Sequence, residues 1–156
     1  MPSQSALSGI NIRAVVIAGL VAGIAFLMIE MAMLAMMGQS PWGPPRMMGA
    51  IVLGRAALTP PDTFDMVVVG VAMMLHLMLS VMYAFVFALV AGRLALLPSL
   101  LAGAVFGAVI YAINFYGFTG VFPWFAMARG MGSIVGHVAF GVILALVYKL
   151  SARQHA

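Results

Sequence analysis

Charge and cysteine are both scarce in this chain of 156 residues. Charged side chains make up 6% of it, with seven Lys and Arg against three Asp and Glu, and it contains no cysteine. The missing cysteine excludes disulfides, thiolate metal sites and cysteine nucleophiles. Soluble domains average about 25% charged residues. The shortage of charge beside 65% hydrophobic residues therefore excludes a water-soluble globule and a disordered chain, and predicts a protein of the lipid bilayer.

Basic runs and catalytic motifs are absent as well. The isoelectric point of about 10.1 comes from a net charge of only +4, and the cations are scattered rather than clustered. Nucleic-acid partners require stripes or patches of Lys and Arg, so we exclude them. The sequence also lacks a phosphate-binding loop, a zinc-protease pair and a nucleophile elbow, and we expect a non-enzymatic protein.

Long hydrophobic runs are what the sequence does contain. A helix needs about 20 apolar residues to cross the hydrocarbon core of a bilayer. The runs lack the strict alternation of barrel strands, so we predict membrane-spanning helices. The four predicted spans cover about residues 12–37, 64–90, 98–118 and 131–150. The predicted fold is an all-α integral membrane protein, a single four-helix domain over residues 1–156.

A proline-flanked segment separates the first two spans. Pro44 and Pro45 favour the start of a helix, and Pro60 and Pro61 favour its end. We therefore predict a periplasmic interfacial or re-entrant helix over about residues 44–58. Tryptophan and arginine near span ends commonly anchor a protein at the membrane interface. The predicted outer-face anchors are Trp42, Arg46, Trp124 and Arg129.

The distribution of cations between the two sets of span ends predicts the topology. Short loops rich in Lys and Arg remain in the cytoplasm. One set of ends carries Arg13, Arg93, Lys149 and Arg153, whereas the other carries Arg46, Arg55 and Arg129 beside Asp62 and Asp65. We therefore expect both termini in the cytoplasm, with an uncleaved first span.

An internal repeat links the two halves of the chain. Residues 18–23 (AGLVAG) recur as residues 102–107 (AGAVFG), and Glu30 and Asn114 each follow the second glycine by seven positions. Each of these spans is followed by a Pro-Trp pair, an arginine and a span with one histidine, either His76 or His137. This order predicts two tandem helical hairpins, related as parallel repeats about an axis along the membrane normal.

Several short motifs of the second half stand in an order that resembles a known family. They are Leu101-Ala-Gly-Ala, Thr119-Gly followed by Pro123-Trp124, and Gly136-His137. This order resembles the YagU-like family of small bacterial inner-membrane proteins, although Asn114 stands about where a family histidine is expected. The resemblance implies a bacterial inner-membrane location and no particular chemistry. Similar short sequences also carry a sodium:proline symporter label, but four spans are too few for such a symporter.

Polar residues within the spans are predicted to form one layer in the outer half of the bilayer. At 1.5 Å per residue, Glu30 lies about 25 Å along its helix from Arg13, and His76 lies about as far from Arg93. Ionisable residues inside a membrane are costly and usually functional. By depth and by helical face, the predicted polar cluster comprises Glu30, His76, Asn114, His137, Ser80 and Tyr83.

The role of this cluster stays open between several hypotheses. Polar groups hold membrane helices together, so the first is structural glue or an accessory role in a larger membrane complex. Alternatively, Glu30 and the histidines handle protons or transport ions. A third hypothesis has His76 and His137 bind haem b, or copper together with Glu30 and methionines of the same half of the bilayer. We expect no cofactor. The expected partners are the lipid bilayer and either a second copy of the chain or a larger complex.

Overall fold

The computed structural model describes residues 10–60 and 63–153, and within those ranges it holds helices and turns but no strand. The long helices are α1 (Ile12–Met36), α3 (Met66–Ala91), α4 (Leu96–Ala112) and α5 (Met131–Arg153). All four are long and apolar enough to cross a membrane, with the third counted through Gly120. The chain is thus an all-α protein with four membrane-spanning helices, as predicted, and their bounds lie close to the predicted spans.

Polar side chains mark several of the helix ends. The side chain of Asn11 accepts a hydrogen bond from the amide of Ala14 at the start of α1. Asp65 does the same for two amides at the start of α3. At the other end of α3, Lys149 Nζ donates to the carbonyl of Gly92 over 2.6 Å. Such partners satisfy backbone groups that a helix end leaves free.

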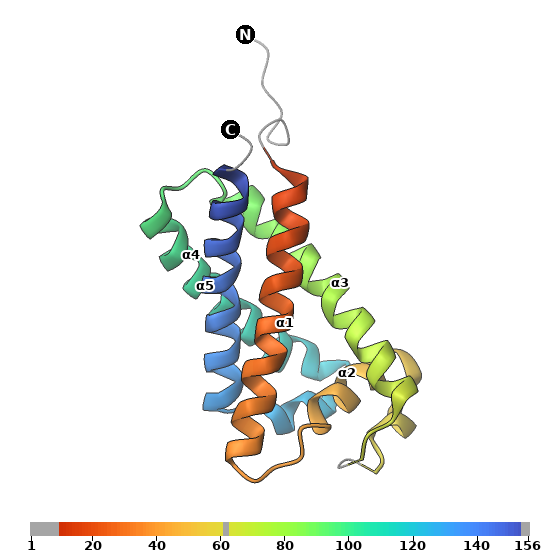
Figure 1. Ribbon diagram of the computed structural model, residues 1–156. Coiled ribbons are helices and arrows are strands. Elements are labelled where there is room, and N and C mark those ends of the chain that lie inside the picture. The colour runs from red at the N-terminus through yellow and green to blue at the C-terminus, as the bar shows by residue number, and fades with distance from the viewer. Residues whose placement is uncertain (1–9, 61–62, 154–156) are drawn as a thin grey trace.

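The four long helices pack in the order α3, α1, α5, α4. Helix α1 packs along both α3 and α5, and α5 packs along α4, whereas α3 and α4 touch only briefly. The first turn of α1 and the last turn of α5 lie together at one end of the bundle, here called the terminal end (Figure 1). The opposite end, where α2 and the short turns lie, is here called the loop end. Towards it, α3 leans away from α1 (Figure 1).

Glycines allow the two helices of each predicted hairpin to touch. A Cβ atom on Gly19 of α1 would stand 2.6 Å from the Cα atom of Val81 in α3. In the second pair, a Cβ atom on Gly103 of α4 would overlap the carbonyl of Gly141 in α5. Equivalent glycines thus face the second helix of their own pair. The tandem repeat stays a prediction, because the long contact of α1 with α5 has only a brief counterpart between α3 and α4.

Short helical segments close the loop end. Helix α2 (Gly43–Leu53) and the turn η1 (Arg55–Leu58) occupy the predicted interfacial segment. Helix α2 packs on α3, where a Cβ atom on Gly49 would lie 2.8 Å from a methyl group of Val68. After α4 come a π-helical turn η2 (Ile113–Gly117) and two 3₁₀ turns, η3 (Phe118–Gly120) and η4 (Pro123–Ala128).

Two of the four predicted anchors are buried inside this closed end. Arg46 is only 4% exposed, and its guanidinium donates to the carbonyls of Ala57 and Thr63 over 2.8 and 2.9 Å. Trp124 is 9% exposed and donates from Nε1 to the carbonyl of Met47 over 3.0 Å. Because unpaired backbone carbonyls are costly to bury, Arg46 and Trp124 serve as internal ties rather than as interfacial anchors.

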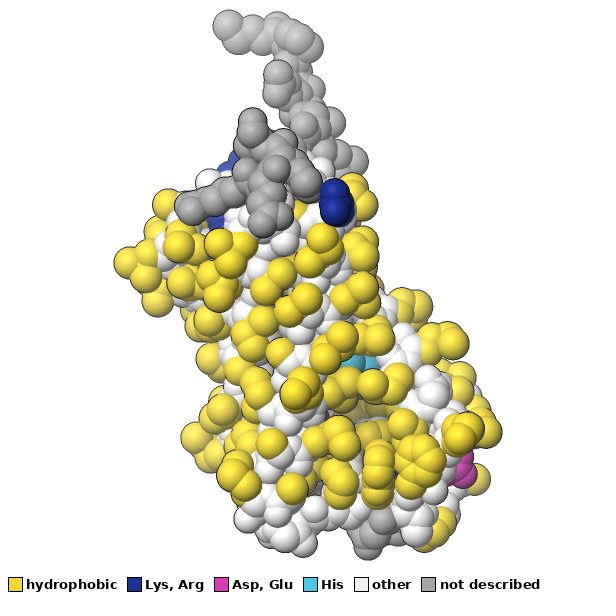
Figure 2. Space-filling model, viewed as in Figure 1, with side chains coloured by type: hydrophobic (Ala, Val, Ile, Leu, Met, Phe, Trp, Pro, Cys, Tyr) yellow, Lys and Arg dark blue, Asp and Glu magenta, His cyan; other side chains and the backbone are white. Residues whose placement is uncertain are grey.

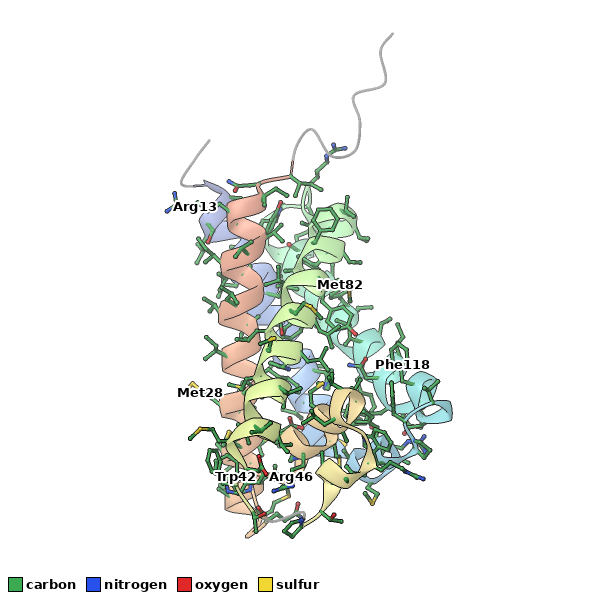
Figure 3. The ribbon with its side chains drawn as sticks, turned by 90° about the vertical axis from the view of Figure 1, so that its right-hand side faces the viewer. Arg13, Met28, Trp42, Arg46, Met82 and Phe118 are labelled. Carbon is green, nitrogen blue, oxygen red and sulfur yellow. The ribbon has the colours of Figure 1, made fainter. Side chains whose placement is uncertain are left out.

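The other two predicted anchors, Arg129 and Trp42, are more accessible. Arg129 is exposed and donates to the carbonyl of Phe115 over 2.7 Å and to the Thr119 hydroxyl over 3.0 Å, so it fixes the turns η2 and η3. Trp42 is half-buried and lies edge-on to Phe64 with the ring centroids 4.9 Å apart. Figure 3 shows Trp42 and Arg46 together at the loop end, opposite Arg13.

Candidate functional site

A cavity of about 320 Å³ lies in the loop-end half of the bundle. It exists because α3 separates from α1 and barely touches α4, while α2 contributes to its wall. Most of the lining is apolar, and its aromatic residues include Phe26, Phe115, Phe118, Phe122, Phe125 and Phe140. The polar lining includes every residue of the predicted polar cluster: Glu30, His76, Ser80, Tyr83, Asn114 and His137.

The cavity opens through the side of the bundle. Three of its lining residues are partly exposed on the apolar surface, Met73 by 38%, Met82 by 48% and Phe118 by 47%. Figure 2 shows a hollow in one face of the molecule, bordered by hydrophobic side chains and with a histidine at its edge. In Figure 3, Met82 and Phe118 lie on separate helical segments on the same side of the molecule. The opening therefore lies on an apolar side of the bundle rather than at one of its ends.

Hydrogen bonds connect three of the polar residues across the cavity. The Tyr83 hydroxyl of α3 donates to Asn114 Oδ1 of η2 over 3.1 Å. The amide nitrogen of Asn114 lies 3.5 Å from His137 Nε2, and His137 Nδ1 lies 2.7 Å from the carbonyl of Ser133. A carbonyl only accepts, so Nδ1 carries the hydrogen and Nε2 accepts from Asn114. One neutral tautomer of His137 therefore satisfies the whole chain.

The second histidine is held from the other side of the cavity. His76 Nε2 lies 3.0 Å from the carbonyl of Gly23 in α1 and must carry the hydrogen, which leaves Nδ1 as an acceptor. No hydrogen bond to Nδ1 occurs within the part of the chain that the structure describes. Among the described residues, the only fully enclosed side-chain nitrogen or oxygen without a hydrogen-bond partner is Ser99 Oγ. His76 Nδ1 is therefore accessible, and since His76 lines the cavity, it is a free acceptor there.

An aromatic ring separates the two histidines. The Phe26 ring stacks on His76 with centroids 5.5 Å apart and meets the edge of His137 at 4.8 Å. Axial haem ligation needs both imidazoles to face one iron atom, and the Phe26 ring occupies that space. Among the described residues, no three His, Asp or Glu side chains come together as a metal site. The geometry thus gives the haem and metal hypotheses no support.

The methionines considered for copper mostly point away from the cavity. Met28 is 67% exposed and Met74 is 74% exposed, on the outer surfaces of α1 and α3. Figure 3 shows Met28 directed outward. Four other methionines line the cavity, Met47 and Met48 from α2 and Met73 and Met82 from α3. Met28 and Met74 are therefore too exposed on the outer surface to serve as thioether ligands for copper(I) beside the histidines.

Glu30 interacts with a residue that the sequence interpretation missed. Its carboxyl group approaches the side chain of Ser133 on α5, and no hydrogen bond joins it to either histidine, all three residues being described. Ser133 is 9% exposed and donates its hydroxyl hydrogen to the carbonyl of Ala128 over 2.8 Å. It precedes His137 by four residues and so shares its helix face, a spacing that could have identified it.

Comparison with protein-family models, with curated proteins and with solved structures found no match. The resemblance to the YagU-like family stays a prediction.

Proposed function

We propose that this chain is a non-enzymatic membrane protein that binds an apolar small molecule within the bilayer. The observation that carries this proposal is the side-opening cavity of about 320 Å³. Binding pockets for small molecules are usually about 300–1,000 Å³, mainly apolar, with a few polar groups that orient the ligand. The aromatic lining and the converging polar side chains fit that description.

Spare hydrogen-bonding capacity distinguishes a binding cavity from polar packing alone. If the cluster acted only as glue between helices, its polar atoms would be used up by one another. His76 Nδ1 is instead a free acceptor, and the Asn114 amide has a second hydrogen that no described partner takes. A π-helical turn such as the one that holds Asn114 is frequent at functional sites.

A matched pair of variants tests the binding proposal. Leu79 lines the cavity, whereas its neighbour Met78 does not and is 60% exposed. Neopentylbenzene, a neutral apolar probe, should raise the thermal unfolding midpoint of the wild-type protein in nanodiscs, because a ligand that binds the folded state stabilises it. Leu79→Trp should abolish that rise and Met78→Trp should keep it. Equal rises in all three proteins would contradict a specific cavity site.

A structural role is the second candidate. The chain of hydrogen bonds through Tyr83, Asn114 and His137 joins α3, η2 and α5, as expected of polar glue in a bundle or in a subunit of a larger complex. Purification in mild detergent tests the subunit hypothesis, since a stable host complex would copurify. A self-sufficient binding protein should elute alone or as a homo-oligomer.

The proposed setting is the bacterial inner membrane with both termini in the cytoplasm. It is supported by the excess of cations at the terminal-end positions and by the YagU-like resemblance. An alkaline phosphatase fused after Arg55 should be active, and one fused at the C-terminus should be inactive. The opposite pattern would invert the topology without altering the cavity proposal.

A further inference from the structure

We infer that the ligand of the cavity is an organic monocation with an apolar body, and that Glu30 is its counter-ion, releasing one proton when the cation binds. This inference rests on the proposed function and adds the charge of the ligand to it. It follows from four features: the ionisable groups of the lining, the hydrogen bonds of the histidines, the surroundings of Glu30, and the aromatic rings of the lining.

The lining residues favour a cation over an anion. The ionisable side chains that face the cavity are Glu30 from α1, His76 and Tyr83 from α3, and His137 from α5. Among the described residues, no Lys or Arg lines the cavity. Arg46, the basic residue of α2, points instead into the loop whose carbonyls it binds. An anionic ligand would therefore find no positive charge, whereas a cationic ligand finds the carboxyl group of Glu30.

Both histidines are accommodated as neutral rings. His76 uses its single hydrogen on the Gly23 carbonyl, and His137 uses its own on the Ser133 carbonyl. A second proton on His137 would place an N–H group at Nε2, against the amide nitrogen of Asn114. The charge that the cavity can offer a ligand is therefore that of Glu30 alone, one negative charge.

The surroundings of Glu30 favour a carboxyl group that keeps its proton in the empty cavity, because the lining is mainly apolar and includes no Lys or Arg among the described residues. Ser133 has a single hydroxyl hydrogen, and it is donated to Ala128. Ser133 thus offers Glu30 an oxygen lone pair, which suits a protonated carboxyl as donor. When a cation enters, the O–H bond of Glu30 breaks, its proton leaves to water, and the carboxylate pairs with the cation, so that the charge of the site is conserved.

The rest of the lining favours an organic cation over a metal ion. Calcium and magnesium need about six or more oxygen ligands, and the cavity supplies one carboxyl group. The faces of aromatic rings attract organic cations through the ring quadrupole. Phe26 lies between the histidines and lines the cavity beside Glu30. An aryl-alkyl ammonium ion has the charge and the apolar surface that this arrangement fits.

Two probes of the same shape separate the charge of the ligand from its apolar body. Benzyltrimethylammonium and neopentylbenzene differ by one positive charge. Both should stabilise the wild-type protein in nanodiscs. Calorimetry of the ammonium compound in two buffers of different ionisation heat should detect release of one proton, and its affinity should rise tenfold per pH unit while Glu30 is protonated. Neopentylbenzene should bind without releasing a proton and without this pH dependence.

Variants of Glu30 complete the test. Glu30→Gln should weaken benzyltrimethylammonium binding at least tenfold, abolish the proton release and leave neopentylbenzene binding intact. Asp65→Asn removes an acid outside the cavity and keeps a capping residue for α3. It should change neither the binding of the two probes nor the proton release.

Each outcome decides a different claim. Unchanged ammonium binding by Glu30→Gln, or wild-type binding without proton release, would overturn the inference while neopentylbenzene binding still supported the proposed function. If the wild type bound neither probe, both the inference and the proposed function would be overturned. If Glu30→Gln does not fold, the proton release and pH dependence of the wild type still decide the question.

Discussion

The two helix pairs of the bundle use glycine at equivalent positions but pack to different degrees. In the pair α4 and α5, the backbones themselves meet, because Cβ atoms on Gly103 and Gly107 would overlap the carbonyls of Gly141 and His137. In the pair α1 and α3, a Cβ atom on Gly19 would also meet backbone, at 2.6 Å from Val81 Cα, but one turn closer to the loop end a Cβ atom on Gly23 would meet the Ser80 side chain, at 2.6 Å from its hydroxyl. The second pair is thus a close-packed scaffold. The first pair separates towards the loop end, and the cavity lies where it opens.

The loops of the two helix pairs also differ, in how deeply the arginine that holds each loop is buried. Arg46 is buried and ties the loop that follows α2, whereas Arg129 is exposed and ties the turn that follows α4. The first pair, which opens, carries the inserted helix α2 and its internal tie. A small membrane bundle can thus keep an open cavity when one pair stays packed backbone to backbone as far as Gly107, while the other is so packed only at Gly19, nearer the terminal end, and is held at its loop.

The largest expected effect tests the difference in glycine packing. Gly107→Ala should destabilise the protein by about 3 kcal/mol or more, because the new methyl group meets backbone that cannot rotate away. Gly23→Ala should cost less, about 1–2 kcal/mol, because the new methyl group meets the hydroxyl and Cβ of Ser80 rather than backbone carbonyls. Reversible unfolding in detergent measures both. Gly70→Ala, with open space around it, is the control. Equal costs at Gly23 and Gly107 would remove the distinction between the pairs.

The second-largest expected effect is the difference in stability between removing Arg46 and removing Arg129. Arg46→Ala should lower stability by about 2 kcal/mol, because the buried carbonyls of Ala57 and Thr63 lose charged donors. Arg129→Ala should cost about 1 kcal/mol or less, since water can reach its exposed site. Unfolding measurements at low and high salt check the order. A larger loss at Arg129 would show that the second loop, and not the first, depends on its arginine.

The two tryptophans provide a smaller contrast. Trp124→Phe should cost about 1 kcal/mol, because it removes the hydrogen bond to Met47 that joins η4 to α2. Trp42→Phe should change stability little, since its ring contact with Phe64 can be kept by phenylalanine. The same unfolding assay compares them. If both substitutions were neutral, the bond between the two loop regions would carry no measurable stability.

The smallest expected effect concerns the polar link between the two pairs. A double-mutant cycle with Tyr83→Phe and Asn114→Leu should give a coupling of about 0.6 kcal/mol, the usual size of a hydrogen bond between membrane helices. Tyr83→Phe with Gly70→Ala, which share no contact, serves as the uncoupled reference. A coupling near zero would mean that α3 and η2 associate without this bond.

The sequence predicts the fold well because hydrophobic length decides it. Four apolar runs can satisfy their backbone in a bilayer only as helices, and Pro44 and Pro60 bound the interfacial segment. Depth is also predictable, because it follows from counting residues along a helix. For that reason the predicted polar cluster, chosen by depth and face, lines one cavity.

The partners of those residues could not be predicted in the same way. They depend on how each helix is rotated and on which helices separate, and packing sets both. Phe26 lies between the histidines, and Glu30 approaches Ser133 rather than an imidazole. The burial of Arg46 and Trp124 likewise depends on how α2 folds against α3 and η4, which no local pattern encodes.

If the cavity binds a ligand as proposed, the side opening at Met73, Met82 and Phe118 determines whether the concentration in the bilayer or in water sets its occupancy. A compound that enters from the hydrocarbon region is first enriched there by partitioning, by about fourfold for each added methylene at about 0.8 kcal/mol. Lengthening an alkyl chain on a ligand therefore increases occupancy even when the new carbons touch no side chain. Apparent potency in water would then follow the oil–water partition coefficient, whereas affinity referred to the bilayer would stay constant.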